Sequence, residues 1–215
     1  GDRSVERLAA WLREHPEWVA ERQVAHGALL FRGFDVRTGE DFEAIARAID
    51  PDLKNEYLGT SPRDAITESG YVFSASELPP YYPIPQHCEM SFTASPPRRV
   101  FFCALRPSDG VGGETPLCDF RLVWRDLDPE VRKRFEEGGL RIVRNYSGPS
   151  GGSRFDLWKL KRWDEMFMTT DRAAVEAKCA EQGFEARWVG EDGLRLVSTQ
   201  PVTRPHPVTG ETVWH

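Results

Sequence analysis

Cysteine and histidine are scarce in this sequence, and their scarcity narrows the chemistry that the chain can carry. The 215 residues include four cysteines and five histidines. No two cysteines stand in a C-x-x-C pair, so the usual spacing of a structural zinc site is missing. We therefore expect reduced, mostly buried thiols, as in a cytosolic protein. The cysteines are Cys88, Cys103, Cys118 and Cys179.

Long apolar runs and an excess of positive charge are also missing. No uninterrupted apolar run approaches the roughly 20 residues of a membrane-spanning helix. The formal net charge is −6, which argues against nucleic acid or an anionic membrane as the main partner. A hydrophobic content of 40% and a charged content of 29% are typical of a globular protein. No basic segment followed by an apolar stretch opens the sequence, and we expect a cytoplasmic protein.

Hydrophobic periodicity predicts a single domain in which helices precede and separate short strands. Residues 5–12 and 38–49 have the spacing of amphipathic helices, and Pro16 suits the first turn of a helix that Gly27 ends. The other predicted helices cover 128–137 and 171–182, and the predicted strands cover 28–31, 99–105, 140–146, 184–189 and 194–199, the last two as a hairpin.

Residues 51–97 break this pattern. They hold much of the proline and serine of the chain and show little periodicity. A long irregular segment in a compact domain is usually functional or disordered. Because this one also carries several aromatic residues, the composition favours an ordered loop near a functional site.

Two histidines stand in an H-x-E pattern, at His15 with Glu17 and at His87 with Glu89. The first pair lies at a predicted helix start, where residues two apart point about 200° away from each other, so we interpret it as structural. The second pair follows Pro85, and in an extended segment residues i and i+2 project from the same face. An imidazole beside a carboxylate is two thirds of the 2-His-1-carboxylate triad that binds Fe(II). On spacing alone, a surface histidine beside a solvated glutamate remains the alternative.

The sequence around His87 resembles the metal-binding region of a known enzyme family. Residues 73–92 carry Ser-Glu-Leu-Pro-Pro and then Ile-Pro-Gln-His-Cys-Glu-Met-Ser. This segment is similar to that of the Fe(II)/2-oxoglutarate dioxygenases of the taurine dioxygenase superfamily, in the branch of clavaminate synthase and the syringomycin-type amino-acid hydroxylases. Further blocks that resemble this family follow in its order, at residues 29–34, 112–119, 127–131, 143–146 and 206–214.

The resemblance implies a fold that is mainly β with flanking helices (α+β), a clavaminate synthase-like double-stranded β-helix or jelly roll with iron inside the barrel. His87 and Glu89 match the first two metal ligands of the family. Thr115 matches the threonine whose hydroxyl helps to hold the 2-oxoglutarate carboxylate, and a hydroxyl can donate to an anion without adding charge. The implied cofactors are Fe(II), the cosubstrate 2-oxoglutarate and dioxygen.

The activity implied by the resemblance is oxidative decarboxylation of 2-oxoglutarate coupled to hydroxylation of a C–H bond, or to desaturation or cyclisation. Glu89 argues against the halogenase variants, in which a small residue replaces the carboxylate. The implied substrate is an amino acid or a derivative of one, free or bound to a carrier protein, in specialised metabolism such as antibiotic biosynthesis. A non-catalytic jelly-roll binding protein and a metalloenzyme that does not use 2-oxoglutarate stay open, as does assembly into a homo-oligomer.

The family pattern also includes a distal histidine, the third ligand, and an arginine that pairs with 2-oxoglutarate, both beyond the block at 206–214. We expect residues 1–215 to be a single oxygenase domain whose C-terminal part, with that histidine and arginine, is not in this sequence. We do not expect His206 or His215 to be a ligand, because neither has the distal context. Candidates for the mouth of the pocket, each with a structural role as the alternative, are Ser74, Ser76, Arg144, Asn145, Tyr146 and the loop 148–152.

Overall fold

The chain divides into two compact units in a computed structural model that describes residues 1–59, 61, 63–75, 81, 83–107, 109–110, 112–151 and 160–215. Unit 1 contains residues 1–56, 63–75 and 101–117, and unit 2 contains residues 57–62, 76–100 and 118–215. Within the described residues, no helix combines the length and the apolar character needed to cross a lipid bilayer.

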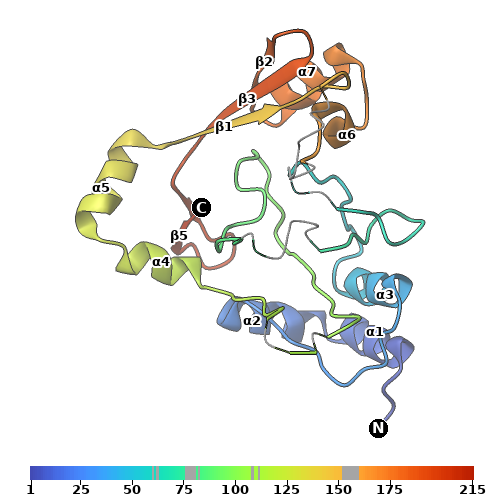
Figure 1. The fold of residues 1–215 in the computed structure, drawn as a ribbon. Coiled ribbons are helices and arrows are strands. Elements are labelled where there is room, and N and C mark those ends of the chain that lie inside the picture. The colour runs from blue at the N-terminus through green and yellow to red at the C-terminus, as the bar shows by residue number, and fades with distance from the viewer. Residues whose placement is uncertain are drawn as a thin grey trace. The chain divides into compact units, whose positions relative to one another are not determined.

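Unit 1 begins with three helices, α1 (Val5–Glu14), α2 (Pro16–His26) and α3 (Gly39–Ile49) (Figure 1). Their ends follow local chemistry. Pro16 occupies the first turn of α2, and Gly27 ends it in the left-handed region with φ 74°. A capping box of Thr38 and Asp41 begins α3.

The core of unit 1 forms where α1 packs against α3. Each of these helices presents apolar residues at a helical spacing, so one face of each is removed from water. The buried residues of this core are Leu8, Ala9, Leu12, Val19, Ile45 and Ala48.

Unit 2 contains the remaining helices and all of the strands in the described part of the chain. The helices are α4 (Phe120–Asp126), α5 (Pro129–Gly138), α6 (Trp163–Phe167) and α7 (Arg172–Glu181). The strands are β1 (Leu140–Tyr146), β2 (Glu185–Val189), β3 (Gly193–Gln200), β4 (Thr203–Pro205) and β5 (Thr212–Trp214).

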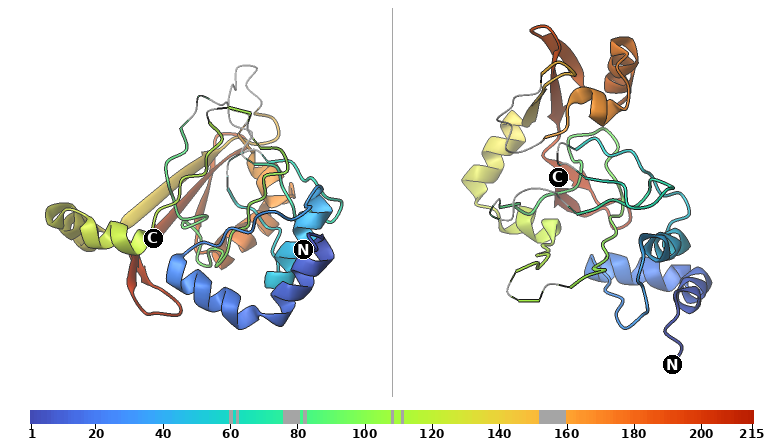
Figure 2. Two further views of the ribbon diagram at one scale, coloured as in Figure 1. Left: turned by 90° about the horizontal axis from the view of Figure 1, so that it is seen from below. Right: turned by 45° about the vertical axis from the view of Figure 1, so that its right-hand side comes forward.

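An antiparallel sheet of order β1-β3-β2 is the centre of unit 2. Val143 pairs with Val197 in the first ladder, and Trp188 pairs with Leu194 in the second. Helices α6 and α7 cover one face of this sheet (Figures 1 and 2). Their apolar side chains and those of the covered face form one core, which includes Tyr146, Trp163, Phe167, Val175, Cys179, Leu194 and Leu196.

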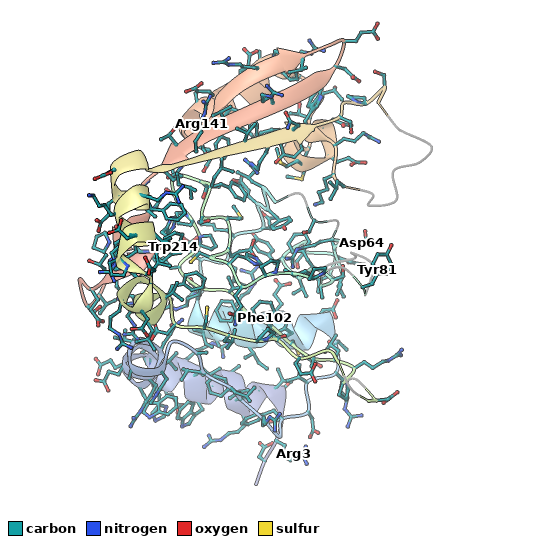
Figure 3. All side chains as sticks on the ribbon, turned by 60° about the vertical axis from the view of Figure 1, so that its left-hand side comes forward. Arg3, Asp64, Tyr81, Phe102, Arg141 and Trp214 are labelled. Carbon is teal, nitrogen blue, oxygen red and sulfur yellow. The ribbon has the colours of Figure 1, made fainter. Side chains whose placement is uncertain are left out.

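A second, two-stranded antiparallel sheet joins β4 to β5. Strand β5 packs against α4, and Trp214, labelled in Figure 3, is the last residue of this strand. Its ring centroid is 6.0 Å from that of Trp124 and 4.9 Å from that of Phe135, the latter edge-to-face. These aromatic contacts attach the end of β5 to both α4 and α5.

The predicted helices are all present, as are the strand at 140–146 and the hairpin of β2 and β3. The predicted strands at 28–31 and 99–105 are not formed. Leu30 is 77% exposed and Phe102, labelled in Figure 3, is 67% exposed. An apolar run becomes a strand only where a partner strand satisfies its backbone, and within the described residues neither segment has one. The described part of the chain therefore combines helices with two antiparallel sheets.

Candidate metal centre

His87 and Glu89 lie side by side in unit 2. The Nε2 atom of His87 is 3.7 Å from the Oε2 atom of Glu89. The side chain of His87 is 55% exposed and that of Glu89 is 25% exposed, so the pair is accessible from solvent. The two side chains lie next to each other, as expected from the sequence, although not in the extended segment from which that expectation was argued.

Neither His87 nor Glu89 lies in a strand. Residues 83–88 have no regular secondary structure, and residues 89–92 form a turn. Within it, the backbone N–H of Thr93 donates to the carbonyl oxygen of Met90 at 3.0 Å. Met90 has φ 52°, a left-handed conformation that is uncommon for a residue with a side chain. The extended segment expected at this point is therefore replaced by a turn that begins two residues after His87.

The orientation of the His87 ring suits a metal ligand. Its Nδ1 atom is 2.8 Å from the carbonyl oxygen of Pro85. A carbonyl only accepts, so Nδ1 carries the proton, and in the neutral ring the lone pair is on Nε2, the atom that lies 3.7 Å from Glu89 Oε2. Metal-binding histidines are commonly held in this way through the nitrogen that does not bind the metal. An imidazole nitrogen and a carboxylate oxygen are a donor set that fits Fe(II).

Cys88, between the two, does not belong to this donor set. Its thiol donates to the carbonyl oxygen of Trp214 at 3.8 Å, which ties the segment to β5. Burial raises the pKa of the Cys88 thiol, and the nearby Cys118 raises it further. The protonated thiol is a poor metal ligand, because metal binding requires the thiolate.

Among the residues that the structure describes, no group of three His, Cys, Asp or Glu side chains is placed to hold a metal ion. The Nδ1 atom of His206 accepts from the backbone N–H groups of Val208 and Thr209, which makes it a cap for the turn between β4 and β5. His215 continues from β5, where its backbone N–H donates to Val202 at 2.9 Å. Burial lowers the pKa of its imidazole, and the charge of Arg204 lowers it further.

Thr115 belongs to unit 1, and its side chain is exposed. It follows Gly112 and Gly113, which have φ values of 105° and 84°. Such values favour glycine, so the backbone path just before Thr115 depends on this glycine pair. The role of Thr115 stays a prediction.

The predicted pocket residues of β1 divide between its two faces. Arg144 and Tyr146 lie on the face toward the core, and burial lowers the pKa of Arg144 and raises that of Tyr146 to about 12. Asn145 is on the other face, where its Oδ1 accepts from Arg195 at 2.8 Å. Ser74 is in unit 1, and its Oγ accepts from the backbone N–H of Asp64. Ser76 and Gly152 lie outside the described residues.

The other H-x-E pair has the structural role expected of it. His15 stacks on Trp11 with ring centroids 4.5 Å apart, and its Nδ1 donates to the Trp11 carbonyl oxygen at 2.8 Å. Glu17 lies in the first turn of α2, where a negative charge favours the helix dipole. One H-x-E motif thus lies at the start of a helix, and the other lies in an irregular segment that leads into a turn.

Two residues near the pair were not expected from the sequence. Gln200 and Arg204 donate hydrogen bonds to the backbone of the turn that follows Glu89. The only sequence signal for them is that they stand just before the block at 206–214, which resembles the family. Within that block, the residue that suggests a metal ligand is His206 rather than either of these two.

Comparison with known proteins identifies the family of the chain. Residues 2–215 match the family model of taurine catabolism dioxygenase TauD, TfdA family. The dapdiamide synthesis protein DdaC of Enterobacter agglomerans is 30% identical over 190 residues, which cover 87% of this chain and 54% of that protein. A clavaminate synthase-like protein of Arabidopsis thaliana is 33% identical over 181 residues, which cover 80% of this chain and 51% of that protein.

A shorter match joins 67 residues to the alpha-ketoglutarate-dependent dioxygenase cnsM of Penicillium expansum, at 36% identity over 31% of this chain and 18% of that protein. The chain spans about half the length of the first two relatives. The family model covers the H-x-E pair and both compact units. The chain therefore belongs to the TauD/TfdA family of dioxygenases.

Proposed function

We propose that this chain is part of an Fe(II)- and 2-oxoglutarate-dependent dioxygenase that oxidises an amino acid or an amino-acid derivative. The observation that carries the proposal is the facing pair of His87 Nε2 and Glu89 Oε2, 3.7 Å apart, with the imidazole held by Pro85. Membership of the TauD/TfdA family supports the cofactors. The name of the relative DdaC, a dapdiamide synthesis protein, supports an amino-acid-related substrate in specialised metabolism.

In this proposal, His87 and Glu89 are two of the three protein ligands of the iron. His87 supplies a neutral nitrogen donor, and the Pro85 carbonyl keeps that donor directed at the site. Glu89 supplies an anionic oxygen, which offsets part of the charge of a divalent cation. A carboxylate at this position also leaves no ligand position for a halide, so the proposal is oxygenation rather than halogenation.

When bound, Fe(II) with 2-oxoglutarate and dioxygen supplies the oxidising power for attack on a C–H bond, with succinate and carbon dioxide as the products of the cosubstrate. Thr115 is proposed to donate its hydroxyl hydrogen bond to a carboxylate of 2-oxoglutarate. The wider proposal is one oxygenase domain across residues 1–215, built on a jelly roll and acting in the cytoplasm. Its support is the family model, which extends over both units.

The test is an anaerobic titration of the protein with Fe(II) and 2-oxoglutarate, followed by the weak visible charge-transfer band of the chelate. We expect the band in the unaltered protein and its loss in His87→Ala and Glu89→Ala. The matched control is Glu17→Ala, because Glu17 belongs to the other H-x-E pair and should leave the band intact. Normal iron binding by both His87→Ala and Glu89→Ala would overturn the ligand assignment.

A second measurement separates the proposed activity from the two other functions. Succinate formation coupled to dioxygen uptake, in the presence of amino-acid substrates, is expected of a 2-oxoglutarate dioxygenase. A metalloenzyme of another type would bind iron without forming succinate. A non-catalytic binding protein would consume neither 2-oxoglutarate nor dioxygen.

A further inference from the structure

The turn that carries Glu89 is held from outside by side chains far away in the sequence. We call residues 89–94 the Glu89 turn. Its own contacts are few: the Thr93 backbone N–H and hydroxyl both donate to the carbonyl oxygen of Met90, at 3.0 and 2.9 Å. Met90 itself is in the left-handed region, with φ 52°, a conformation that L-amino acids rarely adopt. Such a conformation persists only where the surroundings impose it.

Three successive carbonyl groups of the Glu89 turn receive hydrogen bonds from Gln200, the last residue of β3, and from Arg204 in the middle of β4. Gln200 Nε2 donates to Phe92 O at 3.2 Å. The two terminal nitrogens of Arg204 donate to Thr93 O and Ala94 O, both at 3.3 Å. The guanidinium is a rigid planar fork, so both contacts fix the path of the backbone rather than one atom of it.

Arg204 and Gln200 also fix each other. Arg204 Nη2 donates to Gln200 Oε1 at 3.1 Å. This contact settles which end of the Gln200 amide faces the turn, because the oxygen is engaged by Arg204 and the nitrogen remains to donate to Phe92. The two side chains therefore act as one clamp, with Gln200 only 9% exposed.

We infer that Arg204, together with Gln200, is a positioning residue for the His87–Glu89 ligand pair. Its fork holds the Glu89 turn in the conformation that places the Glu89 carboxylate beside the His87 imidazole, although Arg204 itself need not touch the metal. The inference rests on the proposed function, because it takes the pair to be the iron ligands. Metal sites demand ligand positions accurate to roughly 0.5 Å, so the support of the turn matters as much as the ligands.

The test measures Co(II) binding to the full chain without 2-oxoglutarate, by calorimetry and by the visible absorption of bound cobalt. Arg204→Met removes the fork. The matched control is Arg195→Met, because Arg195 is an exposed arginine of β3 that donates to Asn145 and not to the turn. Loss of an outer support typically weakens metal binding 10- to 100-fold, so we expect at least about a tenfold loss in Arg204→Met and none in Arg195→Met.

Arg204→Lys covers the case in which Arg204→Met does not fold, as judged by circular dichroism. Lysine keeps the charge but has a single ammonium group in place of the planar guanidinium, so it cannot hold two carbonyl groups in the same geometry. We expect a thermal midpoint close to that of the unaltered protein, a severalfold weaker affinity for Co(II), and an altered cobalt spectrum at saturation. A residue that only stabilised the fold would change the midpoint and leave the affinity and the spectrum of the folded protein alone.

His87→Ala separates failure of this inference from failure of the proposed function. If His87→Ala loses Co(II) while Arg204→Lys binds it with unchanged affinity and spectrum, the positioning role is overturned and the metal site stands. If His87→Ala binds Co(II) as the unaltered protein does, the proposed metal site is wrong and the positioning role fails with it.

Discussion

The guanidinium carbon of Arg144 lies 3.7 Å from the centroid of the Phe92 ring. Arg144 projects from the covered face of β1, and Phe92 belongs to the Glu89 turn. The same guanidinium donates to the carbonyl oxygen of Leu58 at 2.8 Å and lies 4.9 Å from the ring centroid of Phe184. A cation placed over both aromatic rings thus connects the central sheet of unit 2 to the segment that carries the proposed ligands.

Replacing Arg144 by lysine should destabilise the fold. The lysine ammonium is more strongly hydrated than a guanidinium and cannot stack on Phe92, and the Leu58 carbonyl would lose its partner. An unsatisfied buried acceptor costs about 1–3 kcal/mol, and we expect a loss of that order in the free energy of unfolding by urea. Arg141→Lys on the exposed face of the same strand is the control, with a change within about 0.5 kcal/mol. Equal effects of the two substitutions would contradict the role of Arg144.

Trp163 gives a second stability prediction. It is 2% exposed, its Nε1 donates to the carbonyl oxygen of Asp192 at 2.7 Å, and its ring meets that of Trp188 edge-to-face. Trp163→Phe keeps an aromatic ring but removes the donor, so unfolding should become easier by about 1–3 kcal/mol. Trp18→Phe, at a residue that is 39% exposed, should change the midpoint little. A midpoint for Trp163→Phe equal to that of the unaltered protein would show that the hydrogen bond is dispensable.

The elements that the sequence predicts well are those whose signals are local. The end of α2 follows from Gly27, and the hairpin of β2 and β3 follows from alternating residues around Gly190–Gly193. Helix α6 was missed because its five residues are too few for a periodic pattern, and its place is set by packing of Trp163 and Phe167 against the sheet. The expected strand around Phe102 is not formed. Strand formation also depends on residues distant in the sequence, because a strand needs a partner strand that local sequence does not reveal.

In the candidate site, too, local features can be predicted from the sequence and contacts between distant residues cannot. His87 and Glu89 are two residues apart, so their proximity is a local property, although the extended backbone from which it was predicted is not formed. The contacts of Arg204 with Thr93 and Ala94 join residues 111 and 110 positions apart in the chain. No periodicity or motif in a single sequence encodes a contact of that range, and only the fold brings these groups together.

Gly148 is required by a close approach of two backbone segments. An added Cβ at this position would collide with the backbone oxygen and the side chain of Asp192. Gly148→Ala should therefore lower the thermal midpoint, because the loop of Asp192 must move to accommodate the methyl group. Gly138→Ala is the matched control, since a Cβ at Gly138 meets nothing within 4 Å and α5 gains a better helix former. A midpoint for Gly148→Ala equal to or above that of Gly138→Ala would refute the close approach.

The cysteines should differ in their reactivity. Cys179 is 1% exposed in the core of unit 2, and burial raises its pKa to about 11. The thiolate is the reactive form, so Cys179 should resist alkylation by iodoacetamide at pH 8 in the folded protein. Cys103 and Cys118 are exposed, so the expectation of mostly buried thiols is wrong, and these two should react before Cys179. Mass spectrometry of the labelled peptides gives the order, and early labelling of Cys179 would contradict its burial.

The last prediction concerns the pH dependence of stability through His215. Burial and the neighbouring Arg204 hold the pKa of this imidazole below the value of about 6.5 found in unfolded chains. As the pH falls through 6.5, the unfolded state takes up a proton that the folded state still refuses, so the free energy of unfolding decreases until the folded pKa is passed. Stability linked to His215 is therefore full above pH 6.5 and is lost toward acid. The variant His215→Gln cannot titrate, and its thermal midpoint should fall less between pH 7 and pH 5 than that of the unaltered protein. Parallel curves for the two proteins would mean that His215 does not contribute to the acid sensitivity.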